Sequence, residues 1–269
     1  MKALRFALNH MVAPRRDFAG FFALAREIGI DAVEIRNDLA GIAIADGTPP
    51  VAVRAAAEAA GLTILSVNAL QRFNDWTTQR AAEARALADY AAACGARGLV
   101  LVPVCDGTPG DEARLEEALA ALKPLLMQRG LTGLVEPLGF TFSSLRAKAE
   151  AAAAIAAVDG EGVFLLVHDT FHHHLAQESE FFPSLTGLVH ISGVVDEAVS
   201  VADMRDPHRV LVTAGDRLDN VGQIAALLAG GYRGALSFEP FSPAVHDLAD
   251  PASALHESMA FIAGRTGIS

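Results

Sequence analysis

The sequence predicts an α/β protein, a single (β/α)8 TIM barrel domain spanning residues 1–269. Three observations lead to this fold class. Short apolar runs alternate with longer segments of helical spacing, which is typical of a parallel sheet covered by helices. The runs are apolar throughout, as expected for strands that are buried on both faces. The chain has 269 residues, and a closed barrel of eight units typically needs about 250.

Eight apolar or β-branched runs are the predicted strands, at residues 4–8, 32–35, 63–67, 99–102, 133–135, 163–167, 188–191 and 235–238. The predicted helices follow them, at residues 17–28, 50–60, 77–94, 111–129, 143–157, 219–229 and 251–264, with a short histidine-rich helix after the sixth strand. A doubly wound open sheet is the competing fold. Eight strand–helix units in a chain of this length favour the closed barrel.

Residues that favour helix ends support these boundaries. Five glycines fall where predicted helices end, and glycine adopts the left-handed C-terminal conformation without a Cβ penalty. They are Gly29, Gly61, Gly95, Gly130 and Gly231. Asp111, Ser143 and Asp219 precede predicted helices and are candidate N-caps, because their side chains can accept a hydrogen bond from the first turn.

Amino-acid composition and net charge indicate which kinds of binding partner the protein can have. Hydrophobic residues make up 52% of the chain, which is enough to fill a large core. The formal net charge of −11 disfavours a nucleic-acid partner, because such proteins use a basic face to neutralise phosphates. The only two cysteines, Cys94 and Cys105, form no CxxC pair, and no apolar run is long enough to cross a bilayer. The sequence therefore predicts a reduced, cytoplasmic protein without a membrane partner, and it is compatible with a homodimer.

Polar residues end several of the predicted strands, and in a TIM barrel the active site lies at this end of the strands. The second run ends in Glu34-Ile35-Arg36-Asn37 and the third in Asn68. The later runs contribute Glu136, His168 with Asp169, His190 and Glu239. Each of these residues alone would more often be a solvated or salt-bridged group than a functional one.

Four of them form a chemically coherent set, because they lie at equivalent positions of four consecutive strands: Glu136, Asp169, His190 and Glu239. Three carboxylates and one imidazole suit a divalent ion such as Mn²⁺, Co²⁺ or Mg²⁺, with Zn²⁺ also possible. Without a cation, three carboxylates in one cavity would repel each other and raise one another's pKa. The sequence therefore predicts one divalent-metal site.

Other polar residues are candidates for contact with a substrate. His172 lies three residues after Asp169 and can point back towards the strand end. Arg205 and Arg209 lie in the long loop after the seventh strand, and arginine is suited to binding a substrate oxygen or a carboxylate. For Arg205 a solvated loop position is an equal alternative. No GxxxxGK[ST], GxGxxG or HExxH motif is present.

At these residues the sequence resembles the xylose-isomerase-like TIM barrel superfamily and, within it, the 2-keto-myo-inositol (inosose) isomerases. The resemblance rests on segments that occur in the family's order, namely 33–36, Asn68-Ala69-Leu70 with Phe73-Asn74, 135–139, Asp169-Thr170-Phe171-His172 with His174, 190–192 and 237–241. One position departs from the family pattern. The Gly-x-Gly turn of the seventh loop reads Thr213-Ala214-Gly215, which retains only the second glycine.

The resemblance implies that Glu136, Asp169, His190 and Glu239 bind one divalent metal ion. It also implies that Glu136 and Glu239 act as acid and base on a polyol or sugar ketone, through a metal-stabilised enediolate. The residues implied to contact the substrate are Glu34, Arg36, Asn68, His172 and Arg209.

Alternatives within the same superfamily remain open. Ketose 3-epimerases and hydroxypyruvate isomerases resemble the same barrel, as do lyases of the dehydroshikimate dehydratase type. A catalytically silent sugar-binding barrel is a further possibility. A DNA-repair endonuclease is disfavoured, because that class needs a basic face and more histidine ligands.

Overall fold

The computed structural model describes residues 4–39, 41 and 43–266. Within this part of the chain, eight parallel strands close into one barrel in chain order, and the last strand pairs with the first. Their bounds are β1 Phe6–Asn9, β2 Ala32–Arg36, β3 Thr63–Gln71, β4 Gly98–Val102, β5 Thr132–Val135, β6 Phe164–Asp169, β7 Thr186–Ile191 and β8 Leu236–Phe238. The predicted (β/α)8 fold is confirmed, and the open sheet is excluded.

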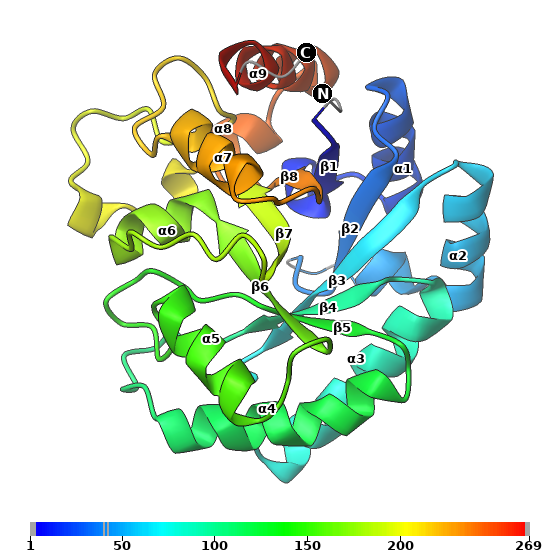
Figure 1. Cartoon of the computed structure of the whole chain (residues 1–269). Helices are drawn as coiled ribbons and strands as arrows, with labels where there is room; N and C mark the ends of the chain where they lie inside the picture. Colours follow the sequence, from blue (N-terminus) through cyan, green and yellow to red (C-terminus); the bar gives the residue numbers. More distant parts are fainter. Residues whose placement is uncertain (1–3, 40, 42, 267–269) are drawn as a thin grey trace.

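The longer helices lie outside the ring of strands (Figure 1). The helices are α1 Phe18–Glu27, α2 Pro50–Ala59, α3 Thr78–Cys94, α4 Glu112–Met127, α5 Lys148–Ala157, α6 Thr170–Ala176, α7 Asn220–Ala229, α8 Pro243–His246 and α9 Pro251–Thr266. All five predicted glycine positions have positive φ angles, for example 81° at Gly95, where α3 ends. Among the described residues, every helix is too short or too polar to serve as a membrane-spanning segment.

Two of the three predicted N-caps are confirmed. Asp111 accepts a hydrogen bond from the backbone N–H of Arg114 at 3.2 Å, and Asp219 accepts one from that of Gly222 at 3.2 Å. The predicted helix start at Ser143 is wrong, because α5 begins only at Lys148. The Ser143 hydroxyl instead donates to the carbonyl of Leu145 at 2.9 Å, within the loop that connects β5 to α5.

Two packed layers fix the barrel. The larger lies between strands and helices and includes fully buried residues such as Phe21, Phe164 and Phe238. The smaller layer, inside the barrel, consists of two clusters of strand residues that pack against one another. Their buried members are Ala69, Val100, Leu134, Val167 and Leu188 in one cluster and Ala7, Ala32 and Ala235 in the other. Because strand side chains alternate with a period of two, the residue two positions later lies on the same face.

A separate apolar cluster covers the carboxyl ends of the strands on the side of α6. It joins the β5–α5 loop, α6 and the long β7–α7 loop, and its buried members are Leu138, Phe140, Phe171, Leu175, Val194, Met204 and Leu218. This cluster gives the loops around the site a core of their own. The loop residues that reach the strand ends are therefore held by burial as well as by hydrogen bonds.

Candidate metal centre and cavity

The predicted metal ligands follow the interior layer by two residues. Leu134 precedes Glu136 in this way, and Leu188 precedes His190. Asp169 follows Val167 on β6, and Glu239 follows Ser237 at the end of β8. The four predicted ligands each offer one donor atom, and these atoms all lie within 4.8 Å of one another. All four side chains are buried.

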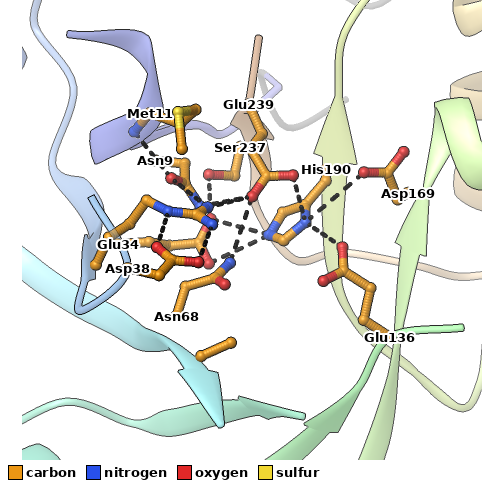
Figure 2. Close-up of polar contacts among 12 residues, drawn as sticks. Asn9, Met11, Glu34, Asp38, Asn68, Glu136, Asp169, His190, Ser237 and Glu239 are labelled. Atoms are coloured by element: carbon orange, nitrogen blue, oxygen red, sulfur yellow. Dashed lines mark hydrogen bonds and ion pairs between the residues drawn. The ribbon is translucent and has the colours of Figure 1, made fainter. Parts of the chain in front are cut away.

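His190 lies at the centre of the group (Figure 2). Its Nδ1 is 2.8 Å from Glu136 Oε1, 3.2 Å from Glu239 Oε2 and 4.0 Å from Asp169 Oδ2. Its Nε2 is 3.2 Å from Glu34 Oε2 on the other side of the ring. Without a cation, the surrounding carboxylates raise the pKa of His190 well above its ordinary value. A metal ion would take the place of the Nδ1 proton while Nε2–H donates to Glu34, as in carboxylate–histidine–metal arrangements.

Glu34 is completely buried beneath His190 and does not line the cavity above it. Two serine hydroxyls donate to it, Ser66 on the adjacent strand β3 at 2.6 Å and Ser237 on β8. Burial by itself raises the pKa of Glu34, but the charge and hydrogen bond of His190 and the Ser237 hydroxyl outweigh it, so the pKa is lowered. The resemblance implies a substrate contact for Glu34, whereas the geometry makes it the group that orients His190.

Glu239 is surrounded by donors. Arg36 Nη1 donates to its Oε1 at 2.6 Å, and Arg209 Nη2 donates to its Oε2 at 3.0 Å. The amides of Asn9 and Asn68 donate to Oε1 at 3.1 and 3.4 Å. Burial raises the pKa of Glu239, but His190 and the two guanidinium groups overcome this and hold the pKa well below its ordinary value.

Glu136 has a different environment. Among the described residues, its side chain has a single hydrogen-bond partner, Nδ1 of His190. Burial raises its pKa, the charge and hydrogen bond of His190 lower it, and the carboxylates of Glu239 and Asp169 raise it again, so the pKa lies above its ordinary value. The two glutamates therefore face the same histidine, and without a cation their pKa values shift in opposite directions.

Asp169 uses its two oxygens for different purposes. Oδ1 caps α6 by accepting from the backbone N–H of Phe171 at 2.7 Å and of His172 at 3.1 Å. Oδ2 accepts from Arg209 Nη2 at 2.6 Å and faces the cluster. The cap also sets the direction of His172, because it fixes the first turn of the helix that carries this residue.

The donor set fits a divalent ion. Three carboxylates and one imidazole come from four adjacent strand ends, and oxygen-rich mixed sets of this kind suit Mn²⁺, Co²⁺, Mg²⁺ or Zn²⁺. The orienting hydrogen bonds are also present, because Glu34 holds the His190 ring and backbone N–H groups hold Asp169. Such supporting contacts are typical of metal sites.

Part of the cluster borders a cavity of about 460 Å³. Glu136 and Glu239 line it, together with four of the predicted substrate contacts, which are Arg36, Asn68, His172 and Arg209. The structure therefore brings these residues to one cavity and leaves Glu34 below it. Arg205, from the long loop after β7, lines the wall. This volume lies within the range of small-molecule sites, roughly 300–1,000 Å³.

Sequence reasoning missed several groups that support the centre. Asn9 donates to Glu239, Ser66 and Ser237 donate to Glu34, and Asp38 binds Arg36 through two hydrogen bonds of 2.7 and 2.8 Å. Asn9 and Ser237 carried a detectable signal, because each lies two residues after an interior alanine, Ala7 or Ala235. Asp38 has no comparable sequence signal, because its contact with Arg36 depends on how the chain turns after β2.

Comparison with known proteins identifies the family. Residues 22–264 match the model of the xylose isomerase-like TIM barrel family, and the chain belongs to this family. A xylose isomerase domain-containing protein from Salmonella typhimurium LT2 is 33% identical over 99% of this chain and 98% of its own, with a TM-score of 0.89. None of the curated proteins compared with the chain matched it.

Two more distant solved structures share the fold. The IolI protein with a bound zinc atom is 18% identical over 98% of both chains, with a TM-score of 0.83. The 3-keto-D-glucoside 4-epimerase from E. coli is 19% identical over 97% of this chain and 99% of its own, with a TM-score of 0.72.

Proposed function

We propose that this protein is a divalent-metal-dependent isomerase or epimerase of a ketose or polyol ketone, with 2-keto-myo-inositol as the first substrate to test. The observation that carries the proposal is the pair of Glu136 and Glu239. Both line the same cavity, and both approach Nδ1 of one histidine, at 2.8 and 3.2 Å. Two carboxylates at one small-molecule cavity suit the removal and return of a proton beside a carbonyl group.

The metal is proposed to be held by Glu136, Asp169, His190 and Glu239. When bound, such an ion supplies Lewis-acid polarisation of a carbonyl oxygen, which is worth several kcal/mol of charge stabilisation. His190 is oriented for this role by Glu34. Solved structures of the same fold include one with a bound zinc atom and several named as sugar epimerases, which is consistent with the proposal.

The two glutamates are assigned different parts. Glu239 is held ionised by Arg36 and Arg209, so it is suited to accept a proton from substrate carbon. Glu136 lines the same cavity and is suited to return a proton to the substrate. General acid–base catalysis by groups of this kind contributes about 10²–10⁴-fold.

The proposal is tested by incubating the metal-loaded protein with 2-keto-myo-inositol in deuterated water and following deuterium uptake by NMR. Glu239→Gln and Glu136→Gln should each lower the exchange rate by about 10²-fold or more. Glu257→Gln, which removes an exposed carboxylate on α9, is the matched control and should leave exchange unchanged. Metal content is measured for every variant, so that loss of metal is separated from loss of proton transfer.

The same assay decides between substrate classes. Exchange with ketoses but not with the inositol ketone would favour an epimerase of the kind named among the structural neighbours. Loss of water from the substrate would favour a lyase. Absence of exchange with every ketone in a protein that retains its metal would contradict the proposal.

A further inference from the structure

Four arginines line the cavity, and one of them differs from the rest. Three of them form ion pairs with carboxylates. Arg36 pairs with Asp38 and Glu239, Arg72 with Asp106, and Arg209 with Asp169 and Glu239. Arg205 also lines the cavity, and within the described ranges it has no carboxylate partner. Arg205 is exposed to solvent at the rim of the cavity, and it is the cavity arginine that the described protein leaves without a carboxylate partner.

The Arg205 head group is nevertheless held in place. Its Nη1 donates to the backbone carbonyls of Ala202 at 2.8 Å and Met204 at 2.6 Å. Its guanidinium carbon lies 5.8 and 5.4 Å from the ring centroids of Phe140 and Phe142, which stack on each other at 4.9 Å. These contacts restrain the planar group, as expected when arginine lies over aromatic rings.

The restraint uses only one end of the guanidinium. Nε and Nη2 make no hydrogen bond with any residue that the structure describes. These two nitrogens form the edge that binds a carboxylate or phosphate through two parallel hydrogen bonds. An oriented guanidinium with this edge free, in the wall of a cavity, has the geometry of an anion-binding group.

A second polar atom on the same wall is also free. The ring of His172 lines the cavity and packs edge-on against Phe140 at 5.1 Å, and its buried Nδ1 has no hydrogen-bond partner. Buried polar atoms are normally satisfied, so this nitrogen indicates a missing ligand or water. Phe140 therefore packs against both Arg205, whose free edge lines the cavity, and His172, whose buried Nδ1 is unsatisfied.

We propose that the preferred substrate is a ketone that carries an anionic group, a carboxylate or a phosphate, at the end remote from its carbonyl, in preference to the neutral 2-keto-myo-inositol, and that Arg205 binds this group. The inference rests on the proposed function, because that function places the ketone at Glu136 and Glu239. Arg205 acts as a specificity-determining residue for charged substrates and does not take part in the proton transfers.

The test compares three probes that differ only at C6: D-fructose, D-fructuronate and D-fructose 6-phosphate. Binding to the metal-loaded and the metal-free protein is measured by calorimetry, which needs no turnover. At least one anion should bind tenfold or more tightly than fructose. Arg205→Gln should weaken that anion about tenfold to hundredfold and leave fructose within twofold. Arg205→Lys, which keeps the charge and loses the planar edge, should fall between.

Arg85→Gln is the matched control, because it removes an exposed arginine on α3 that lies away from the cavity, and it should change no affinity. Preference for fructuronate or for the phosphate identifies the anion. Equal binding of all three probes, or an anion preference that survives Arg205→Gln, would overturn the inference. If anions bind in an Arg205-dependent way but no deuterium exchange occurs, the proposed function is rejected and the inference is not. If only neutral ketones undergo exchange, the inference is rejected and the proposed function is not.

Discussion

Lys148 and His168 show how buried polar residues outside the cavity hold the metal centre. Lys148 Nζ donates to His168 Nδ1 at 3.0 Å and to the carbonyl of Glu180 at 3.0 Å. The other ring nitrogen of His168 donates to the side-chain oxygen of Gln223 at 2.9 Å. His168 directly precedes Asp169, so this chain of hydrogen bonds ties the end of β6 to α5 and α7. Lys148 is buried, and burial lowers its pKa to about 8 although Glu178 and Glu180 oppose the shift.

This lysine predicts a pH dependence of stability. Because its folded-state pKa of about 8 lies below the unfolded value of about 10.4, the unfolded chain binds more protons between these two pH values. The free energy of unfolding should therefore rise with pH in this window. Urea unfolding at pH 8 and pH 10 should show that the stability difference between wild type and Lys148→Met grows by about 1–3 kcal/mol.

Lys123→Met, which removes a half-buried lysine that donates to the carbonyl of Val158, is the matched control for this measurement. A wild type–Lys148→Met difference that stays constant between the two pH values, or that shrinks, would show that Lys148 is fully charged in the folded state throughout this range.

One wall of the cavity comes from the loop of residues 192–219, between β7 and α7. It carries both Arg205 and Arg209, and it pairs with itself through an antiparallel bridge between Gly193 and Val210. Asp216 organises its far end. One carboxylate oxygen accepts from the backbone N–H of Val194 at 3.2 Å, and the other accepts from the N–H of Asn220 at 2.9 Å. The loop is therefore fixed at both ends, although its described helical structure consists of two short 3₁₀ helices, Val201–Asp203 and Asp206–His208.

Replacing Asp216 should loosen this loop. Asp216→Ala leaves several donors without a partner, so the free energy of unfolding should fall by about 1–3 kcal/mol. Substrate affinity should fall as well, because Arg209 and Arg205 lose their support. Asp203→Ala, in the same loop, removes only an exposed bond from the Ser200 hydroxyl and should have little effect on either property. Equal effects of the two variants in denaturant titration and substrate binding would contradict this role for Asp216.

At the scale of the whole molecule, the metal centre connects half of the barrel. Its predicted ligands come from the ends of β5, β6, β7 and β8, and Arg36 on β2 contacts the same cluster through Glu239. An ion at this position would bind only the folded chain, since unfolding separates residues 136 and 239. A ligand of this kind stabilises the native state through mass action.

Metal addition should therefore raise the melting temperature. At a hundred times the dissociation constant the gain is about 2.7 kcal/mol, which corresponds to roughly 5–10 °C for a protein of this size. Asp169→Asn should reduce this gain, because it removes one anionic ligand while its side-chain oxygen can still cap α6. Scanning calorimetry with Mn²⁺, Co²⁺, Zn²⁺ and Mg²⁺ provides the measurement. No stabilisation by any of the four ions would argue against the site.

The sequence by itself determined the architecture and grouped the residues of the candidate centre. Apolar runs buried on both faces and glycines at helix ends depend on local chemistry, so they predicted the barrel and its glycine positions correctly. Because strand ends in a barrel meet on one side, Glu136, Asp169, His190 and Glu239 could be grouped before their distances were known. The helix start predicted at Ser143 was wrong because a capping residue is a local signal, whereas the loop that contains Ser143 is held by contacts with distant residues.

Only the tertiary structure decided what each charged group does. Glu34 and Arg36 lie two residues apart on β2, yet Glu34 is buried beneath His190 while Arg36 lines the cavity and binds Glu239. Arg205 and Arg209 lie four residues apart, yet one is ion-paired in the centre and the other has a free edge. Such differences depend on which residues from distant segments are brought within hydrogen-bonding distance, and spacing along the chain does not encode that.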